Sequence, residues 1–442
     1  MFKTLAKYIL TFITIISIVS CSVSAYQINE FTLNANTAIL LSLDTGEILY
    51  SQNAEQKVYP ASLTKILSAI IVVENTPNLD SEIITTTKSA LRAISGTGSS
   101  VIGLKEGEQL TARQALACLM VSSGGDVAYA IAEHYGGSTQ GFLDLMNAKA
   151  AEIGMKNSHF SNPVGLHDEL TYTTGNDIAV LAKYALQYEV LKEITSVSRY
   201  VVPATNMAPS RTLSTTNFLI DPTTNYYYQY AKGFKTGFTD QAGRCVVSTA
   251  SYGGYNYLCV IMGCKNADGR RNEFLDSRNL YRWAFNNFEY KSLLDTTKPV
   301  TEIKVNLSIS TDHIPLYAEK DLTKIFPKAA DSSTITVRPN LIAESVDAPV
   351  KEGDILGTAD IIYSEQVIGT VNLVAHNNIK PNIILQIARA FKNFFSSVIF
   401  KIILIILLLA AAIYVGIIIK LNLGRSHRRK VKYIPYDKHG KK

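Results

Sequence analysis

The sequence predicts an α/β domain of the α+β type, in which helices flank an antiparallel sheet, followed by a small all-β domain and a C-terminal transmembrane helix. Three observations predict this order: strands enclose a helical middle in residues 26–297, short alternating strands fill residues 298–380, and residues 402–419 are continuously apolar. The chain has 442 residues, 47% of them hydrophobic, which suffices for two or three domains with a sizeable core.

The N-terminal end has the parts of a secretory signal peptide, which we place at residues 1–25. A basic start precedes the apolar residues 8–19, and small residues then permit cleavage after Ala25. A lipoprotein-like cleavage box that ends at Cys21 is the alternative. We favour the ordinary signal peptide, because the chain carries a membrane anchor at its other end.

Residues 26–297 predict the larger domain, with its helices between two sets of strands. The expected strands are a hairpin, 38–43 and 48–51, and three consecutive antiparallel strands, 231–236, 244–250 and 257–262. The expected helices follow Ser62 and then cover residues 110–120, 126–134, 178–188 and 272–288. The last of these helices carries the only tryptophan, Trp283, which we expect to pack on the sheet.

The C-terminal third predicts a small domain and a membrane anchor. Short strands separated by turns indicate a β-sandwich-like domain at 298–380, and apolar residues at helical spacing indicate an amphipathic linker at 381–397. Residues 398–420 then predict a transmembrane helix, and the basic residues 421–442 should stay in the cytoplasm. We therefore expect a single-pass protein of the cell membrane whose folded domains are extracytoplasmic.

Charge and cysteine content exclude several other classes. The formal net charge is +6, much of it in the C-terminal tail, so the nearly balanced body gives no indication of a nucleic-acid surface. Four cysteines remain after removal of the signal peptide, and no two have the spacing of metal ligands. We expect buried thiols, with a Cys259–Cys264 disulfide as the alternative, and neither a metal nor another cofactor.

The first stretch that could carry chemistry is Ser62-Leu63-Thr64-Lys65. Three residues are almost one helical turn, so Ser62 and Lys65 share a face at the positive end of a helix dipole. A hydroxyl beside a neutral amine is an activated nucleophile, and burial or a nearby cation would lower the pKa of Lys65 enough to keep it neutral. Taken alone, the pattern is better explained by a serine helix cap followed by a surface lysine.

Two further clusters change this interpretation. Ser122-Ser123-Gly124-Gly125-Asp126 falls on a predicted interhelical loop, and Lys235-Thr236-Gly237 falls at the end of a predicted strand. Each alone could be an ordinary turn or strand end. Together, in this order and in an exported chain, they form the signature of class A β-lactamases and penicillin-binding proteins.

Over residues 38–289 the chain resembles the low-molecular-mass penicillin-binding proteins, which are serine-type D-alanyl-D-alanine carboxypeptidases. The segments that match the habits of this family are residues 60–65, 119–124, 162–166, 173–177 and 233–240. The resemblance implies a serine DD-peptidase/β-lactamase-like fold that removes the terminal D-alanine from peptidoglycan stem pentapeptides and is inhibited by β-lactams. Residues 298–374 fit the family's C-terminal domain more loosely.

The same resemblance implies roles for three catalytic residues. Ser62 would attack the carbonyl of the penultimate D-alanine, with Lys65 as the general base. Ser123 would relay the proton to the amine of the leaving D-alanine. Water would then hydrolyse the acyl-enzyme.

The third motif would bind the substrate. Lys235 would hold the proton relay and favour the substrate's terminal carboxylate by its positive charge, and Thr236 would hydrogen-bond that carboxylate. Gly237 completes the motif. The oxyanion hole of the family maps to the backbone amides of Ser62 and Phe238.

Gly125 is the one departure from the family pattern, which usually has asparagine at this position. The asparagine amide would contact the substrate backbone and the catalytic lysine, so either a neighbour such as Ser122 or Asp126 substitutes for it, or activity is reduced. A poorly active, membrane-tethered peptidoglycan-binding protein is therefore one alternative. A β-lactamase is the other, although no Glu-x-x-Leu-Asn segment lies between the second and third motifs.

Overall fold

The computed structural model describes residues 31–265, 269–330, 334–363 and 365–427. Two compact units make up the chain: the first comprises Met1–Lys291 and Thr323–Asp331, and the second comprises Ser292–Leu322 and Ser332–Lys442. The predicted signal peptide, the lipoprotein alternative at Cys21 and the end of the predicted cytoplasmic tail lie outside the described residues.

A five-stranded sheet in the order β2-β1-β9-β8-β7 forms the centre of the first unit, and all its neighbouring strands are antiparallel. Its strands are β1 (Thr37–Ser42), β2 (Ile48–Gln52), β7 (Ala231–Thr239), β8 (Gly243–Tyr252) and β9 (Tyr255–Cys264). The predicted hairpin and the three predicted consecutive strands are confirmed. Because β1 pairs with β9, with Ile39 opposite Val260, the two ends of the domain close one sheet.

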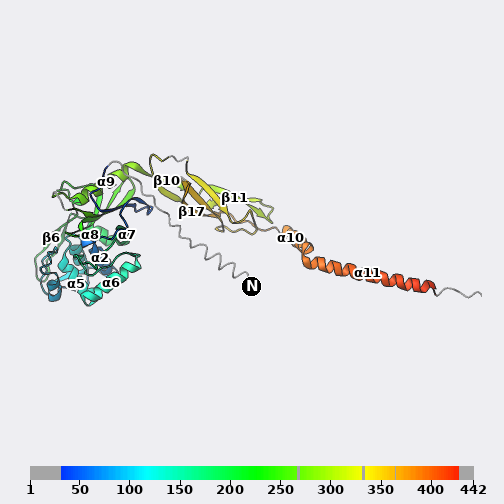
Figure 1. The fold of residues 1–442 in the computed structure, drawn as a ribbon, viewed down its shortest axis with the longest axis horizontal. Helices are drawn as coiled ribbons and strands as arrows, with labels where there is room; N and C mark the ends of the chain where they lie inside the picture. Colours follow the sequence, from blue (N-terminus) through cyan, green and yellow to red (C-terminus); the bar gives the residue numbers. More distant parts are fainter. Residues whose placement is uncertain (1–30, 266–268, 331–333, 364, 428–442) are drawn as a thin grey trace, which may run out of the picture. The chain divides into compact units, whose positions relative to one another are not determined.

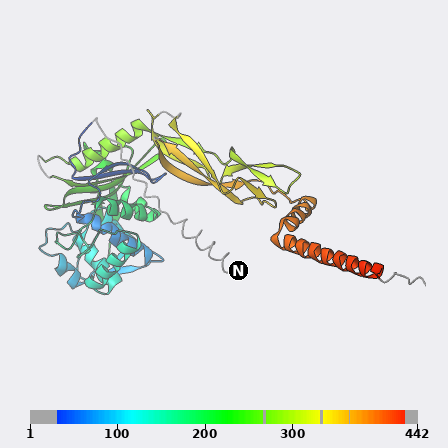
Figure 2. The ribbon, with the colours of Figure 1, turned by 45° about the vertical axis from the view of Figure 1, so that its right-hand side comes forward.

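Helices cover both faces of this sheet (Figures 1 and 2), and each face contributes to an apolar core. Ile39 and Leu41 of β1 belong to one apolar core, whereas Ala38 and Leu40 belong to another, because successive strand residues point to opposite faces. The first core is shared with α2 (Thr64–Glu74), α3 (Lys88–Ile94), α4 (Ala112–Met120), α5 (Gly125–Gly136), α6 (Thr139–Glu152), α7 (Gly175–Ala185) and α8 (Glu189–Thr195). The second lies under α9 (Asn272–Asn287), where Trp283 packs on the sheet as predicted.

The helix after Ser62 is deeply buried. Every residue of α2 from Thr64 to Val72 is buried, including Lys65. A short 3₁₀ turn, η1 (Ala61–Leu63), precedes the first α-helical residue, so Ser62 lies in the turn that leads into α2. The prediction of a helix start at Ser62 is thereby confirmed, with a 3₁₀ turn as its first part.

Several smaller elements were not predicted. The hairpin of β3 (Ile83–Thr85) and β4 (Gln109–Thr111) precedes α4, and Thr111 caps that helix through a capping box with Gln114. The remaining ones in this unit are β5 (Arg199–Val202), β6 (Arg211–Ser214), η2 (Phe218–Ile220) and the helices α3, α6 and α8. β10 (Phe288–Leu294) pairs with β13 (Leu322–Pro327) in a separate two-stranded sheet.

The second unit contains a six-stranded sheet in the order β14-β16-β17-β12-β11-β15. Its strands are β11 (Pro299–Asn306), β12 (His313–Ala318), β14 (Thr336–Leu341), β15 (Ser345–Asp347), β16 (Ile355–Tyr363) and β17 (Gln366–Ala375). Inward residues such as Ile303, Leu316 and Leu373 form a core of their own. The predicted all-β domain is confirmed.

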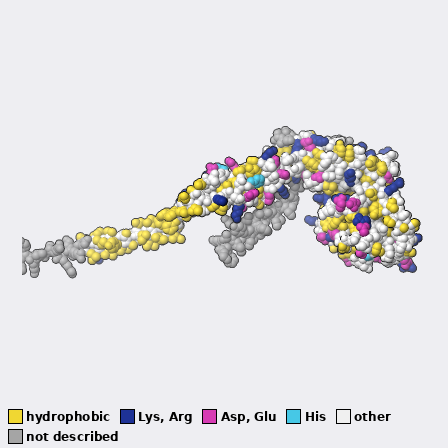
Figure 3. All heavy atoms as spheres, turned by 180° about the vertical axis from the view of Figure 1, so that it is seen from behind, with side chains coloured by type: hydrophobic (Ala, Val, Ile, Leu, Met, Phe, Trp, Pro, Cys, Tyr) yellow, Lys and Arg dark blue, Asp and Glu magenta, His cyan; other side chains and the backbone are white. Residues whose placement is uncertain are grey.

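Two helices end the described chain, α10 (Ile383–Ser396) and α11 (Val398–His427). Within α11, the residues Val398–Leu421 are long and apolar enough to cross a membrane by length and composition. Figure 3 shows this helix covered by hydrophobic side chains. None of the residues tested for this span is buried inside the protein, so the helix is no core helix of a soluble domain.

Candidate active site

The first motif forms a hydroxyl–amine pair at the start of α2. The Nζ atom of Lys65 donates a hydrogen bond of 2.9 Å to Ser62 Oγ, so the two side chains share a face as predicted. Lys65 is fully buried behind Ser62. Ala61, just before the serine, has a φ of +48°, a left-handed conformation that is costly for a residue with a Cβ and clusters at functional sites.

A loop from a distant segment holds Lys65 from the other side. Lys65 Nζ also donates to the carbonyl of Val164 at 3.1 Å, and Asn162 Oδ1 fixes this loop by accepting from the amide of Gly165 at 2.8 Å. Gly165 has a φ of +78°, and a Cβ there would lie 1.8 Å from the carbonyl oxygen of Ala61. Only glycine allows the loop to approach the nucleophile this closely.

Ser123 of the second motif and Lys235 of the third motif are in direct contact. Lys235 Nζ donates to Ser123 Oγ at 3.0 Å and to the carbonyl of Thr236 at 2.9 Å, although Ser123 and Lys235 are 112 residues apart in sequence. Ser123 lies between α4 and α5 with a φ of +60°, a second left-handed residue at this site. Both side chains are buried, which makes their hydrogen bond strong.

The end of β7 runs directly against the turn that contains Ser62. A Cβ on Gly237 would lie 3.0 Å from the backbone nitrogen of Ser62, a tight contact that a side chain could make only if its neighbours shifted slightly. The hydroxyls of Thr236 and Thr216 share a hydrogen bond of 2.5 Å. Phe238 is exposed beyond them, with its ring beneath the Arg244 guanidinium.

A cleft of about 850 Å³ joins these parts. Of the predicted site residues, Ser62, Ser123, Thr236, Gly237 and Phe238 line it. Lys65 and Lys235 lie buried behind its wall, within hydrogen-bond distance of the two serines. The structure thus brings all three motifs to one cleft. Its further lining residues are Thr97–Ser100, Val164–His167, Thr215, Thr216, Phe218, Thr239–Gln241 and Arg271.

Burial makes Lys65 a base near neutral pH. It lowers the pKa of Lys65 from 10.5 to about 7, against the opposing effect of the Asp126 carboxylate. The pKa of Lys235 is lowered well below its ordinary value, first by burial and then by the positive charge of Lys65. Two amines in one dry site repel each other when both are protonated, so the charge predicted for Lys235 requires a neutral Lys65 or an anionic partner.

These pKa directions predict how the rate of acylation depends on pH. A lowered pKa leaves more Lys65 neutral at neutral pH, and below that pKa the protonated amine cannot accept the proton of Ser62. The second-order rate of acylation by a penicillin should therefore rise with pH and level off above about 7. The measurement is stopped-flow labelling from mildly acidic to mildly alkaline pH. A flat profile, or a rise only near the ordinary lysine pKa, would contradict the assignment.

Arg271 is a cleft residue for which the sequence carries no decisive signal. It lies at the N-terminal boundary of α9 and donates to the buried carboxylate of Glu273 at 2.6 Å. Its guanidinium group lies 4.5 Å from the centre of the Phe218 ring. This places a guanidinium group at the cleft, with its charge paired to the carboxylate of Glu273.

The sequence suggested Ser122 or Asp126 as a substitute for the asparagine missing at position 125. The structure shows that both side chains form hydrogen bonds away from the cleft. Asp126 is buried, and its carboxylate accepts the backbone amides of Ile102, Gly103 and Leu104 at 3.0–3.1 Å. Ser122 Oγ donates to the carbonyl of Ser214 at 3.4 Å. Neither residue lines the cleft, so neither is placed to replace an asparagine amide.

Cysteines and metal-ligating residues add no second reactive centre to the described part of the chain. The four cysteines there are buried free thiols, so the Cys259–Cys264 disulfide does not form. Burial raises the pKa of each, for example that of Cys245 to about 12, which keeps it a thiol. The described residues contain no group of three or more His, Cys, Asp or Glu side chains arranged to hold a metal.

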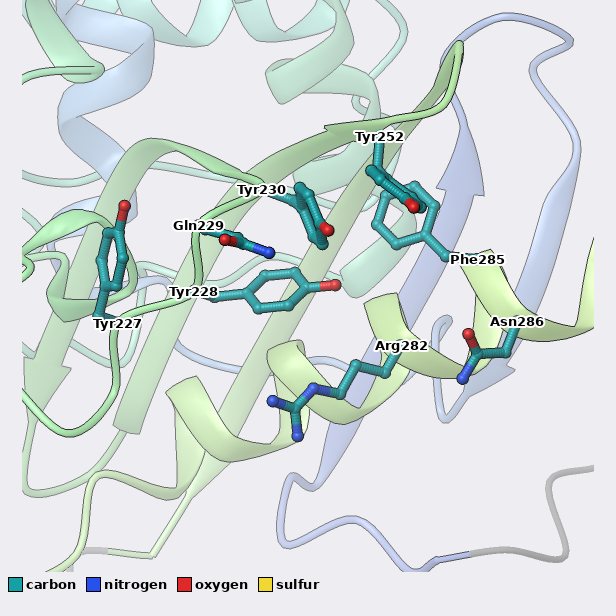
Figure 4. Close-up of a pocket in the computed structure, with 8 residues that line it drawn as sticks. All are labelled: Tyr227, Tyr228, Gln229, Tyr230, Tyr252, Arg282, Phe285 and Asn286. Carbon is teal, nitrogen blue, oxygen red and sulfur yellow. The ribbon is translucent and has the colours of Figure 1, made fainter.

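A second hollow, of about 550 Å³, lies beside α9 (Figure 4). Aromatic rings line it and pack on one another, with the Tyr230 and Tyr252 centroids 4.2 Å apart and Phe285 beside both. Arg282 supplies its positive charge. None of the predicted site residues lies here, and its lining holds no pair of nucleophile and base.

Comparison with known proteins points to one family for both parts of the chain. A family model described as D-alanyl-D-alanine carboxypeptidase matches residues 23–266, and one described as the C-terminal domain of penicillin-binding protein 5 matches residues 288–381. The first match covers all three motifs of the candidate site, whereas Arg271 lies beyond it.

Individual relatives agree with the family models. The chain is 28% identical over 352 residues to D-alanyl-D-alanine carboxypeptidase DacF of Bacillus subtilis, covering 80% of this chain and 87% of the relative. It is 31% identical over 253 residues to a D-alanyl-D-alanine endopeptidase of Pseudomonas aeruginosa, covering 57% and 77%. Penicillin-binding protein 5 of Haemophilus influenzae superposes with a TM-score of 0.65 at 26% identity, covering 80% of this chain and all of that structure.

Proposed function

This chain belongs to the D-alanyl-D-alanine carboxypeptidase family, and we propose that it removes the terminal D-alanine from peptidoglycan stem pentapeptides through an acyl-enzyme on Ser62. One observation carries the proposal: the Ser62 hydroxyl lies 2.9 Å from a buried amine whose pKa is lowered to about 7. Such a pair is a serine nucleophile with its general base.

Acylation begins at this pair. Lys65 accepts the proton of Ser62 as Oγ attacks the carbonyl carbon of the penultimate D-alanine. The backbone amides of Ser62 and Phe238 stabilise the resulting oxyanion, and each such donor contributes about 3 kcal/mol. The close approach of β7 to the turn of Ser62, where a Cβ on Gly237 would lie 3.0 Å from the backbone nitrogen of Ser62, supports this placement of the two amides.

The second pair completes the transfer. As the peptide C–N bond breaks, Ser123 donates its proton to the amine of the leaving D-alanine and takes up the proton that Lys65 received from Ser62, so that Ser123 is again a hydroxyl and Lys65 again neutral. Lys235 holds the Ser123 hydroxyl at 3.0 Å. Thr236 hydrogen-bonds the terminal carboxylate of the substrate. The substrate carboxylate also raises the pKa of Lys235. Burial opposes protonation of Lys235 in the free protein, so this lysine becomes positively charged when substrate binds.

Water then hydrolyses the ester on Ser62 and regenerates the hydroxyl. A β-lactam presents a strained amide beside a carboxylate, as the terminal dipeptide does, and acylates the same serine. The partners of the site are therefore peptidoglycan stem peptides and β-lactam antibiotics, with no nucleic acid and no cofactor in the reaction.

The membrane location follows from the two ends of the chain. The signal peptide, residues 1–25, exports the chain, and the helix at 398–420 anchors it in the cell membrane with a single pass. The catalytic domain, residues 26–297, and the β-rich domain, 298–380, are extracytoplasmic, and the basic tail, 421–442, is cytoplasmic. The apolar length of α11 supports the anchor.

Release of D-alanine from an N-acylated tripeptide ending in D-Ala-D-Ala tests the proposal. The purified protein should release stoichiometric D-alanine over many turnovers, and penicillin pretreatment should block the release. Rapid hydrolysis of penicillin without D-alanine release would instead indicate a β-lactamase. Stable penicillin binding without release would indicate a tethered peptidoglycan-binding protein, and either result overturns the carboxypeptidase assignment.

A further inference from the structure

We propose that Ser99 replaces the asparagine that the second motif lacks, and that its hydroxyl hydrogen-bonds the acyl-side peptide carbonyl of the bound stem peptide. The proposal rests on the proposed function of the cleft. It identifies a substrate-binding residue outside the three motifs, on the loop between α3 and β4.

The space beside Gly125 is already occupied. A Cβ added to Gly125 would lie 2.7 Å from Ser99 Oγ and 2.8 Å from Ile94 Cδ1. Nonbonded carbon contacts are favourable only from about 3.5 Å, so a side chain at position 125 and the present position of the Ser99 hydroxyl exclude each other. Ser99 therefore stands where an asparagine side chain would begin.

Backbone contacts on both sides of Ser99 hold it in this place. The amide of Gly125 donates to the carbonyl of Ser100 at 2.7 Å, which fastens the loop to the first residue of α5. Beyond it, three loop amides donate to the Asp126 carboxylate. Before it, the amide of Ser99 donates to Thr97 Oγ1 at 3.3 Å.

The Ser99 hydroxyl is available for a ligand. Ser99 lines the same cleft as Ser62 and Ser123 and is half-buried. Within the described ranges no protein group forms a hydrogen bond with its Oγ. A hydroxyl in this position can donate to a peptide carbonyl without breaking any existing contact.

Two different groups thus take over the two contacts of an asparagine. The lysine contact goes to the main chain, because Lys65 Nζ donates to the carbonyl of Val164. The substrate contact goes to Ser99. In the proposed function, Thr236 and Lys235 bind the terminal carboxylate of the peptide. The acyl portion of the peptide then lies on the side of the cleft near Ser99. The first polar group of this acyl portion is an amide carbonyl.

Two penicillins test this contact, because they differ in that carbonyl. Benzylpenicillin carries an acyl side-chain amide, whereas 6-aminopenicillanic acid has a free amine at the same ring position. Ser99→Ala should slow acylation by benzylpenicillin about fivefold to tenfold, the effect of one lost neutral hydrogen bond, and should leave the rate with 6-aminopenicillanic acid unchanged. Ser95→Ala, on the same loop but outside the cleft lining, is the matched control and should alter neither rate.

The variant Gly125→Ala provides a second, independent test of the Ser99 contact. Gly125 is helical, so alanine suits the backbone, but its methyl group displaces the Ser99 hydroxyl and also presses on the end of the Ile94 side chain. The variant should reproduce the selective loss, and its thermal unfolding temperature, measured alongside, separates this effect from a general loss of stability. The double variant Ser99→Ala/Gly125→Ala should be no slower than Ser99→Ala alone. Equal slowing of both penicillins, no slowing, or additive losses would overturn the role of Ser99. Absence of acylation in the unaltered protein would instead overturn the proposed function.

Discussion

Ser62→Ala should abolish both D-alanine release and covalent labelling by a fluorescent penicillin. The variant removes the only oxygen through which the proposed ester forms, and loss of a serine nucleophile lowers turnover by a factor on the order of 10⁵ or more. The measurements are D-alanine release from an acylated D-Ala-D-Ala peptide and gel fluorescence after labelling.

The fold should survive this change, because the Ser62 hydroxyl makes its hydrogen bond to Lys65 at the cleft and fills no apolar core. An unchanged thermal unfolding temperature would show this. Ser95→Ala, at an exposed serine outside the cleft, should retain full activity. Residual release by Ser62→Ala at more than a trace would exclude Ser62 as the nucleophile.

Lys65→Met should lower acylation by a factor of about 10²–10⁴, the usual contribution of a general base. Methionine fills the buried volume of the lysine side chain without the amine that accepts the proton of Ser62. The measurement is the second-order rate of acylation by penicillin, followed as a function of pH.

The residual activity of this variant should lose the rise toward pH 7 that the unaltered protein shows, because the titrating group is gone. Lys88→Met, at an exposed lysine on α3, is the matched control and should keep both the rate and its pH profile. Retention of the same pH profile in Lys65→Met would assign the base to another residue.

Much of the fold could be predicted from local patterns in the sequence. The strands of the first sheet and the buried helix after Ser62 carry strong apolar signals, and the structure confirms them. The helix α6 and the strands β12 and β13 were missed. α6 buries only four residues of its fourteen, and β13 returns to the first unit from within the second, an arrangement that no local pattern predicts.

The sequence predicted those parts of the candidate site whose side chains lie within short motifs. The pairing of Ser62 with Lys65 follows from helical spacing alone. By contrast, the meeting of Ser123 with Lys235 depends on tertiary structure, and only the resemblance to a family suggested it.

Other parts of the site have no side-chain motif that assigns them a role, although residues 162–166 match the family. The Val164 carbonyl that accepts from Lys65 is a backbone group, and Thr216 and Ser99 reach the cleft only through packing of segments far apart in the chain. The departure at Gly125 was visible in the sequence. Its structural consequence, the close approach of Ser99, was not, because it depends on how the loop folds over α5.

Mapping of the acylated residue tests the assignment of the nucleophile most directly. The full-length protein would be labelled with a fluorescent penicillin, digested, and analysed by tandem mass spectrometry of the labelled peptide. We expect a single modified residue, Ser62, in the segment that precedes Lys65. A label on Ser123, Ser99 or any other residue would contradict the mechanism.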